Sequence, residues 1–114
     1  MSEQLLHLTE ESLWKAARET GTYEMSTRGR TLSEEGFIHC SLPHQLADVA
    51  RAVYGADGEG LVVLVIDRDR LEAPVRYEAV KPGGEEYPHV YGPLPVSAVV
   101  EVRPWEDRGP GHQG

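Results

Sequence analysis

The sequence predicts a single α+β domain in which a mixed or mostly antiparallel sheet packs against two main helices. The 114 residues are enough to build one hydrophobic core but not a second lobe. Segments with helical spacing fall early in the chain and strand-like segments gather late, an order that favours α+β over a regular βαβ array. We therefore expect one globular domain over residues 1–105 and a flexible, polar C-terminal tail over residues 106–114.

The first elements expected are a short strand over residues 5–8 and a helix over residues 10–20. Thr9 is suited to cap this helix, because a threonine hydroxyl can accept a hydrogen bond from a free backbone N–H of the first turn. Gly21 is suited to end it. Both ends of the helix are therefore marked.

Residues 23–35 have no clear period, so we expect a loop there, followed by a strand over residues 36–40. Apolar residues then recur at helical spacing over residues 42–54. Ser41 is suited to cap this second helix, and Gly55 to close it. The spacing makes this the clearest helix in the sequence.

Residues 61–66 form an unbroken aliphatic run, which is typical of a central strand covered on both faces. A single helical turn is expected over residues 67–71. Further strands are expected over residues 75–80 and 98–104. The sheet thus takes most of its strands from the second half of the chain.

The segment from Glu78 to Pro95 concentrates ionisable and aromatic side chains among prolines and glycines. We interpret it as a rigid loop, since proline restricts the backbone and loops on a scaffold often carry functional groups. His89 and Tyr91 are its candidate site residues. The alternative is a surface connection whose tyrosines pack against the edge of the domain.

The formal charge of −8 disfavours nonspecific nucleic-acid binding, which depends on Lys and Arg. No apolar run approaches the roughly 20 residues of a membrane-spanning helix. Cys40 is the only cysteine, so an intrachain disulfide is impossible, and the acidic start does not resemble a leader peptide. We expect a cytoplasmic protein that binds a small molecule, not nucleic acid or a membrane. The oligomeric state stays open.

Two histidines interrupt apolar strands, His7 and His39. Strand alternation places His39 on one face and Cys40 on the other, so Cys40 is interpreted as a small buried side chain and not as a nucleophile. A single histidine in a strand is usually a hydrogen-bonded structural residue. Two in similar settings favour a shared pocket.

Four motifs together resemble a bacterial family known as domain of unknown function 952. They are Leu-His-Leu-Thr at residues 6–9, Glu-Gly-Phe-Ile-His-Cys-Ser at 35–41, Val-Arg-Tyr-Glu at 75–78 and Tyr-Pro-His-Val-Tyr-Gly-Pro-Leu at 87–94. That family is in turn similar to the ADP-ribosyltransferases, whose sheet cradles NAD. The resemblance thus implies an ADP-ribosyltransferase-like fold and NAD as a possible cofactor.

The resemblance also implies roles for individual residues. Glu78 would stabilise the positive charge that develops on the ribose as nicotinamide leaves, and His39 would assist as a second catalytic group. The cofactor would be bound by His7, His39, His89, Tyr91, Arg28 and Arg30. His7 would contact a ribose, and the two arginines would approach phosphates.

Three hypotheses follow from these residues. The first is a nucleotide-dependent enzyme of ADP-ribosyltransferase type, and the second is a noncatalytic module that binds a small ligand in the same pocket. The third is a metal site built from His7, His39 and His89 with Glu78, since imidazoles and a carboxylate suit zinc. All three require these side chains to converge with Tyr91 in one hollow.

Overall fold

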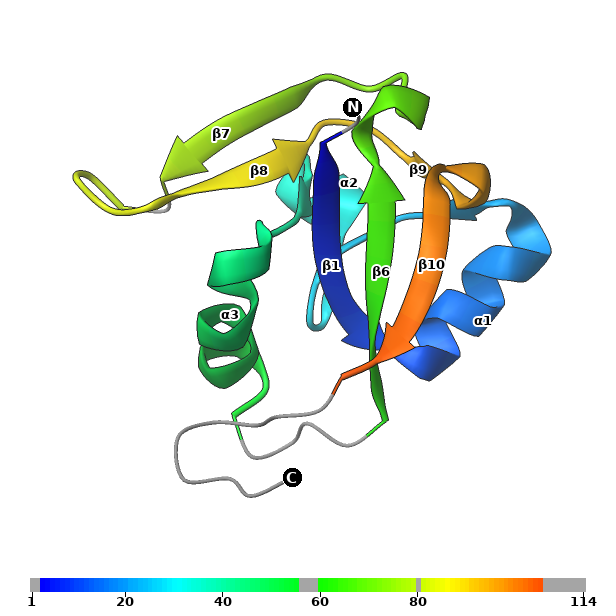
Figure 1. Ribbon diagram of the computed structural model, residues 1–114. Helices are drawn as coiled ribbons and strands as arrows, with labels where there is room; N and C mark the ends of the chain where they lie inside the picture. The colour runs from blue at the N-terminus through cyan, green and yellow to red at the C-terminus, as the bar shows by residue number, and fades with distance from the viewer. Residues whose placement is uncertain (1–2, 56–59, 80, 106–114) are drawn as a thin grey trace.

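The computed structural model describes residues 3–55, 60–79 and 81–105 (Figure 1). The expected C-terminal tail and residue 80 of the expected strand at 75–80 lie outside this part of the chain. The helices are α1 (Glu11–Thr20), α2 (Leu32–Glu35) and α3 (Leu46–Val53), with 3₁₀ turns η1 (Pro43–Gln45), η2 (Arg68–Arg70) and η3 (Val96–Ala98). The strands are β1 (Gln4–Glu10), β2 (Thr22–Tyr23), β3 (Met25–Thr27), β4 (Arg30–Thr31), β5 (Ile38–His39), β6 (Leu61–Asp67), β7 (Val75–Ala79), β8 (Glu86–Val90), β9 (Leu94–Pro95) and β10 (Val99–Pro104).

The central sheet has the strand order β1-β6-β10, and both pairings are antiparallel. The predicted central position of the aliphatic run is confirmed, because β6 lies between the other two strands and Leu61 to Ile66 are all buried. In Figure 1 the three strands stand side by side, with α3 on one side of them and α1 on the other.

Alternation along the central strands divides the core into two clusters. Leu64 and Ile66 of β6 belong to the cluster that includes Trp14 of α1. Val63 and Val65 point the other way and pack in a cluster with Leu46 of α3. Successive strand residues face opposite sides of a sheet, so this sheet is covered on both faces by apolar side chains.

The second sheet has the order β5-β8-β7, again with antiparallel pairing. Every pairing among the described strands is antiparallel, which settles the expected mixed or mostly antiparallel arrangement. Leu6 forms an isolated bridge with Ser41, and their backbones exchange hydrogen bonds of 2.8 and 2.7 Å. This bridge ties the chain directly after β5 to the central sheet.

The segment at residues 78–95 is not the loop that its prolines predicted. Residues 86–90 form β8, the middle strand of the second sheet, with Pro88 opposite Tyr77. Proline lacks an N–H, yet the Pro88 carbonyl still accepts a hydrogen bond from the N–H of Cys40 at 2.9 Å. One missing donor therefore did not prevent a central strand here.

Three smaller predictions were also wrong. Residues 23–35 hold short strands and α2, whose N-cap Thr31 forms a capping box with Glu34. Thr9 does not cap α1: it lies within β1, where it is buried. The helix expected over 42–54 is present, as a 3₁₀ turn followed by α3, but Ser41 does not cap it, because the backbone of Ser41 pairs with Leu6.

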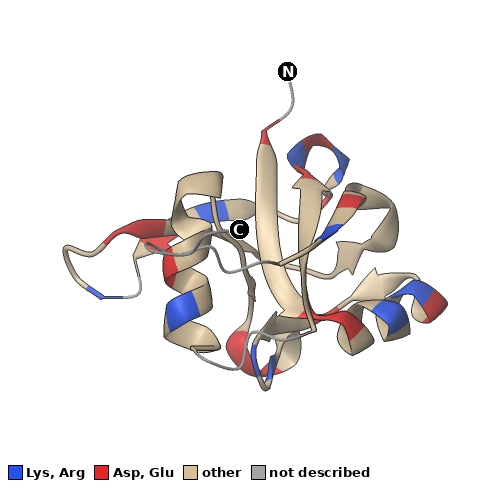
Figure 2. Cartoon of the chain, turned by 60° about the horizontal axis from the view of Figure 1, so that its bottom comes forward, with Lys and Arg blue, Asp and Glu red and all other residues tan. Residues whose placement is uncertain are grey.

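The expected helix over 10–20, the turn after β6 and the buried state of Cys40 are confirmed. Figure 2 shows many of the acidic and basic residues on helices, turns and strand ends. In the central sheet, β1 and β6 carry charged residues only at their ends, whereas β10 holds Glu101 and Arg103 within the strand. In the described part of the chain, no helix is both long and apolar enough to cross a membrane.

Candidate functional site

A cleft of about 450 Å³ opens where β3 and the end of α2 face the second sheet. Two carboxylates, two imidazoles, two hydroxyls, one aromatic ring and one methyl group line it. The lining residues are Ser26, Thr27, Glu35, Phe37, His39, Glu78, Ala79 and His89. We refer to this set as the cleft.

The pleat of the second sheet places the cleft's titratable side chains. Ile38 and Val90 are opposite each other in the register, and both are fully buried in the core cluster. Their neighbours His39 and His89, which are also paired, must point to the other face. Burying one face of the sheet therefore puts both imidazoles on the same opposite face.

Glu78, His89 and His39 form a continuous hydrogen-bonded array. Oε1 of Glu78 lies 2.9 Å from Nδ1 of His89, and Nε2 of His89 lies 3.2 Å from Nδ1 of His39. A carboxylate can only accept, so Nδ1 of His89 carries a proton. When His89 is neutral its Nε2 accepts from Nδ1 of His39, which leaves the lone pair of the array on Nε2 of His39.

The local environment favours a neutral imidazole at His39 and a charged carboxylate at Glu78. Burial, with smaller effects from His89 and His7, lowers the pKa of His39 to about 4. Hydrogen bonds from Tyr91 and His89 lower the pKa of Glu78 below its ordinary value. At neutral pH the array thus has an anion at one end and an unprotonated nitrogen at the other.

Aromatic rings hold this array in place. Phe37 stacks on His89 with ring centroids 4.0 Å apart and an interplanar angle of 13°. The Tyr91 hydroxyl donates to Oε1 of Glu78, and the Arg76 guanidinium lies 5.2 Å from the centre of the Tyr91 ring. The sequence singled out Tyr91, and the structure places it against Glu78 and not among the residues that line the cleft.

Ser26 in β3 is the one buried side chain of the described chain whose polar atom has no hydrogen-bond partner. The residue is 1% exposed and lines the cleft. A buried hydroxyl without a partner costs roughly 1–3 kcal/mol. A water molecule or any other polar group that enters the cleft would satisfy this hydroxyl.

His7 does not line the cleft. Its ring is buried in the interior, with Nδ1 2.7 Å from the carbonyl oxygen of His39 and Nε2 2.7 Å from the Tyr23 hydroxyl. That hydroxyl lies 2.8 Å from Oγ1 of Thr9. Burial lowers the pKa of His7 to about 4, so the neutral ring donates from Nδ1 and accepts at Nε2. The expected contact between His7 and a ribose therefore has no support in this geometry.

The two arginines of the 28–30 turn lie in different surroundings. Arg28 donates to the carbonyl oxygen of Val53 at 3.3 Å and lies over the Tyr54 ring, 5.1 Å from its centre. Arg30 forms an ion pair of 2.7 Å with Oε2 of Glu35, a cleft residue. Neither arginine is among the residues that line the cleft, and Arg30 is paired with one that is.

The convergence expected from the sequence is thus partial. His39, His89 and Glu78 share one cleft, Tyr91 adjoins them, and His7 touches only the backbone of His39. This removes His7 from the expected metal site, and no group of three or more potential ligands occurs among the described residues. Sequence reasoning missed Ser26, Thr27 and Glu35, for which the sequence holds no periodic signal. Phe37 was foreseeable, since it shares a strand face with His39.

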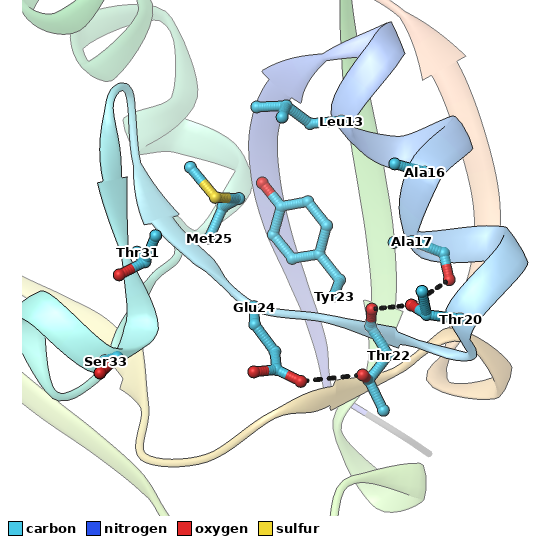
Figure 3. Close-up of a pocket in the computed structure, with 10 residues that line it drawn as sticks. All are labelled: Leu13, Ala16, Ala17, Thr20, Thr22, Tyr23, Glu24, Met25, Thr31 and Ser33. Carbon is cyan, nitrogen blue, oxygen red and sulfur yellow. Dashed lines mark hydrogen bonds between the residues drawn. The ribbon is translucent and has the colours of Figure 1, made fainter.

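A second hollow, of about 540 Å³, lies between α1 and residues 22–33 (Figure 3). Leu13, Met25 and the Tyr23 ring line it, and Glu24 is its only carboxylate, bonded to Thr22 at 2.9 Å. Although larger than the cleft, this groove has no array of titratable groups. We therefore place the candidate site in the cleft.

Comparison with known proteins gives a family and a fold. The crystal structure of protein CC0527 from Caulobacter crescentus is 30% identical, with a TM-score of 0.72, over 87% of this chain and 82% of that chain. Its solution NMR structure is 27% identical, with a TM-score of 0.64, over 90% and 84%. No curated protein matches. Residues 8–102 match the family described as "Protein of unknown function (DUF952)", and the chain therefore belongs to the DUF952 family.

Proposed function

We propose that the cleft binds a small organic molecule and that His39 acts as its acid–base group. The observation that carries this proposal is the Glu78–His89–His39 array, which leaves the unprotonated Nε2 of His39 as its terminal group. The unpartnered hydroxyl of Ser26 in the same cleft supports the binding of a ligand.

The array can move a proton without moving a side chain. If Nε2 of His39 accepts a proton from a ligand, its Nδ1 proton can pass to Nε2 of His89. The positive charge then forms on His89, directly beside the carboxylate of Glu78 at 2.9 Å. A carboxylate stabilises an imidazolium, so Glu78 makes His39 a stronger base than an isolated buried imidazole.

An NAD-type ligand and ADP-ribosyltransferase-like transfer are the finer form of this proposal. Its support is the position of the Glu78 carboxylate, which lies in the cleft and could stabilise positive charge developing on a sugar. Lysine and arginine are absent from the lining, and Arg30 is held by Glu35, so pyrophosphate would have to bind beyond the cleft. The noncatalytic module is the alternative, and it uses the same residues.

Nitrogen NMR tests the acid–base role without any ligand. Long-range proton–nitrogen spectra should show His39 protonated at Nδ1 and unprotonated at Nε2 at pH 7. The H89Q variant should change the tautomer balance of His39. H44Q should not, because the His44 side chain is 70% exposed and pairs with Glu85, which is not part of the array. A His39 ring protonated at Nε2 at pH 7 would contradict the proposal.

Binding and turnover are tested together on ¹⁵N-labelled protein. NAD and a panel of small aromatic cations, anions and neutral molecules are titrated while amide shifts of the cleft residues and nicotinamide release are followed. Shifts with release support transfer, and shifts without release support the noncatalytic module. If no compound shifts the cleft residues, the proposed binding site is wrong.

A further inference from the structure

The side chains that line the cleft offer more hydrogen-bond acceptors than donors, and this imbalance limits which ligands can bind there. This step rests on the proposed function, that the cleft is a binding site. The lining side chains include two carboxylates and the imidazole of His39, and they include no Lys, Arg, Asn, Gln or Trp. The side-chain donors that remain for a ligand are the hydroxyls of Ser26 and Thr27, which can accept as well as donate.

Both carboxylates keep one oxygen for a ligand. The two contacts that Arg30 makes with Glu35, at 2.8 and 2.7 Å, go to Oε2. The contacts that His89 and Tyr91 make with Glu78 go to Oε1. Oε1 of Glu35 and Oε2 of Glu78 thus have no protein partner among the described residues, and the side chains are 27% and 37% exposed.

The third acceptor is Nε2 of His39, which is unprotonated at neutral pH by the argument above. Three side chains that line the one cleft therefore each have an acceptor without a protein partner among the described residues, and two of these acceptors are anionic. Ser26 provides the independent sign that a ligand belongs here, since its Oγ is buried and lacks a partner.

A protonated primary amine matches this set. An ammonium group has three N–H donors and no acceptor, and its charge is opposite to that of the carboxylates. A phosphate or carboxylate group would bring only acceptors and negative charge. Arg30 and Arg76 offset part of the negative charge, but they contact Glu35 and the Tyr91 ring and do not line the cleft. The protein's formal charge of −8 also attracts cations at long range.

We propose that the cleft is selective for small molecules that carry a protonated primary amine. The ammonium group binds between Glu35 and Glu78, and an apolar or aromatic body lies against Phe37. The amine donates to the free carboxylate oxygens and to the lone pair on Nε2 of His39.

Three probes of nearly equal shape test the proposal on the full chain: benzylamine, benzyl alcohol and sodium benzoate. They are cationic, neutral and anionic at pH 7, and each is titrated into ¹⁵N-labelled protein at fixed ionic strength. We expect benzylamine to shift the amides of the cleft residues with a dissociation constant about tenfold lower than that of benzyl alcohol, and benzoate to bind most weakly.

Two variants and one control assign the selectivity to the carboxylates. E35Q and E78Q should each reduce the preference for benzylamine over benzyl alcohol several-fold. E72Q removes the same charge from an exposed position outside the cleft and should leave the preference unchanged. If E78Q disturbs the second sheet, the E35Q variant alone tests the amine selectivity, because Glu35 lies outside that sheet.

The outcomes separate this inference from the proposed function. Equal binding of the three probes, or a preference for benzoate, would overturn the amine selectivity while leaving the cleft as a binding site. Selectivity that survives both E35Q and E78Q would also overturn it. If none of the three probes shifts the cleft residues while another compound of the broader panel does, the amine inference fails and the site stands.

Discussion

Acidification should destabilise the protein through His7 before most carboxylates titrate. The pKa of His7 is lowered by burial from 6.5 to about 4, so the unfolded chain binds this proton more readily than the folded protein. The free energy of unfolding is therefore unaffected well above pH 6.5 and falls as the pH drops from about 6.5 towards 4. From pH 7 to pH 5, this single group should remove about 2 kcal/mol.

Urea unfolding at pH 7, 6 and 5 measures this loss, and H7N is the variant to compare. An asparagine amide can still donate to the His39 carbonyl, but it does not titrate in this range. H7N starts from a lower stability because it loses the contact with Tyr23, so the comparison concerns only the change with pH. His39 contributes in the same direction to both proteins and cancels.

The expected result is that the wild-type protein loses about 2 kcal/mol more than H7N between pH 7 and 5. Histidine NMR provides a direct check, since the His7 ring should not titrate above pH 5. Equal losses in the two proteins, or a His7 titration midpoint between pH 6 and 7, would refute the reasoning.

Two further predictions concern buried groups away from the cleft. Burial raises the pKa of Cys40 to about 12, so its thiol should react with a disulfide reagent at pH 8 only as fast as the protein unfolds, and a rapid reaction in native protein would disprove this. Gln45 accepts from the N–H of Leu42 and donates to the carbonyl of Glu86, at 2.9 and 2.8 Å. Q45L should therefore lower the free energy of unfolding, measured with urea, by about 2 kcal/mol or more. H44A, at the neighbouring exposed position, should change it by less than about 0.5 kcal/mol. Similar losses in the two variants would contradict the prediction for Gln45.

The sequence predicted elements whose apolar pattern is decided by the core. The unbroken run of β6 indicated a strand covered on both faces, and the alternation around His39 placed Ile38 and Cys40 in the interior. Prediction from the sequence failed where pairing with other strands outweighed the conformational preference of a single residue. Pro88 indicated a loop, but the backbone around it pairs with β5 and β7, and these pairings outweigh one missing N–H.

Strand alternation predicted His39, the Pro-rich segment predicted His89, and the family resemblance predicted Glu78. That the three share one face follows from the pairing of β5, β8 and β7, which the sequence did not predict. Ser26 and Glu35 lie in a stretch without periodicity, so only the folded chain brings them to the cleft. His7 was misjudged for a related reason: alternation shows which face a residue takes, but not whether that face is covered. The face of β1 that holds His7 lies under the Tyr23 ring.

The second sheet couples the position of the array to the stability of the fold. Ile38 and Val90 are fully buried on one face, while their sequence neighbours His39 and His89 form the array on the other. A shift of one residue in either strand would move an imidazole into the apolar core and expose a large aliphatic side chain. The same energy that packs the core therefore fixes the 3.2 Å contact between the two rings. Replacing array side chains should accordingly alter proton transfer while leaving the sheet register intact, whereas replacing Ile38 or Val90 should disturb both.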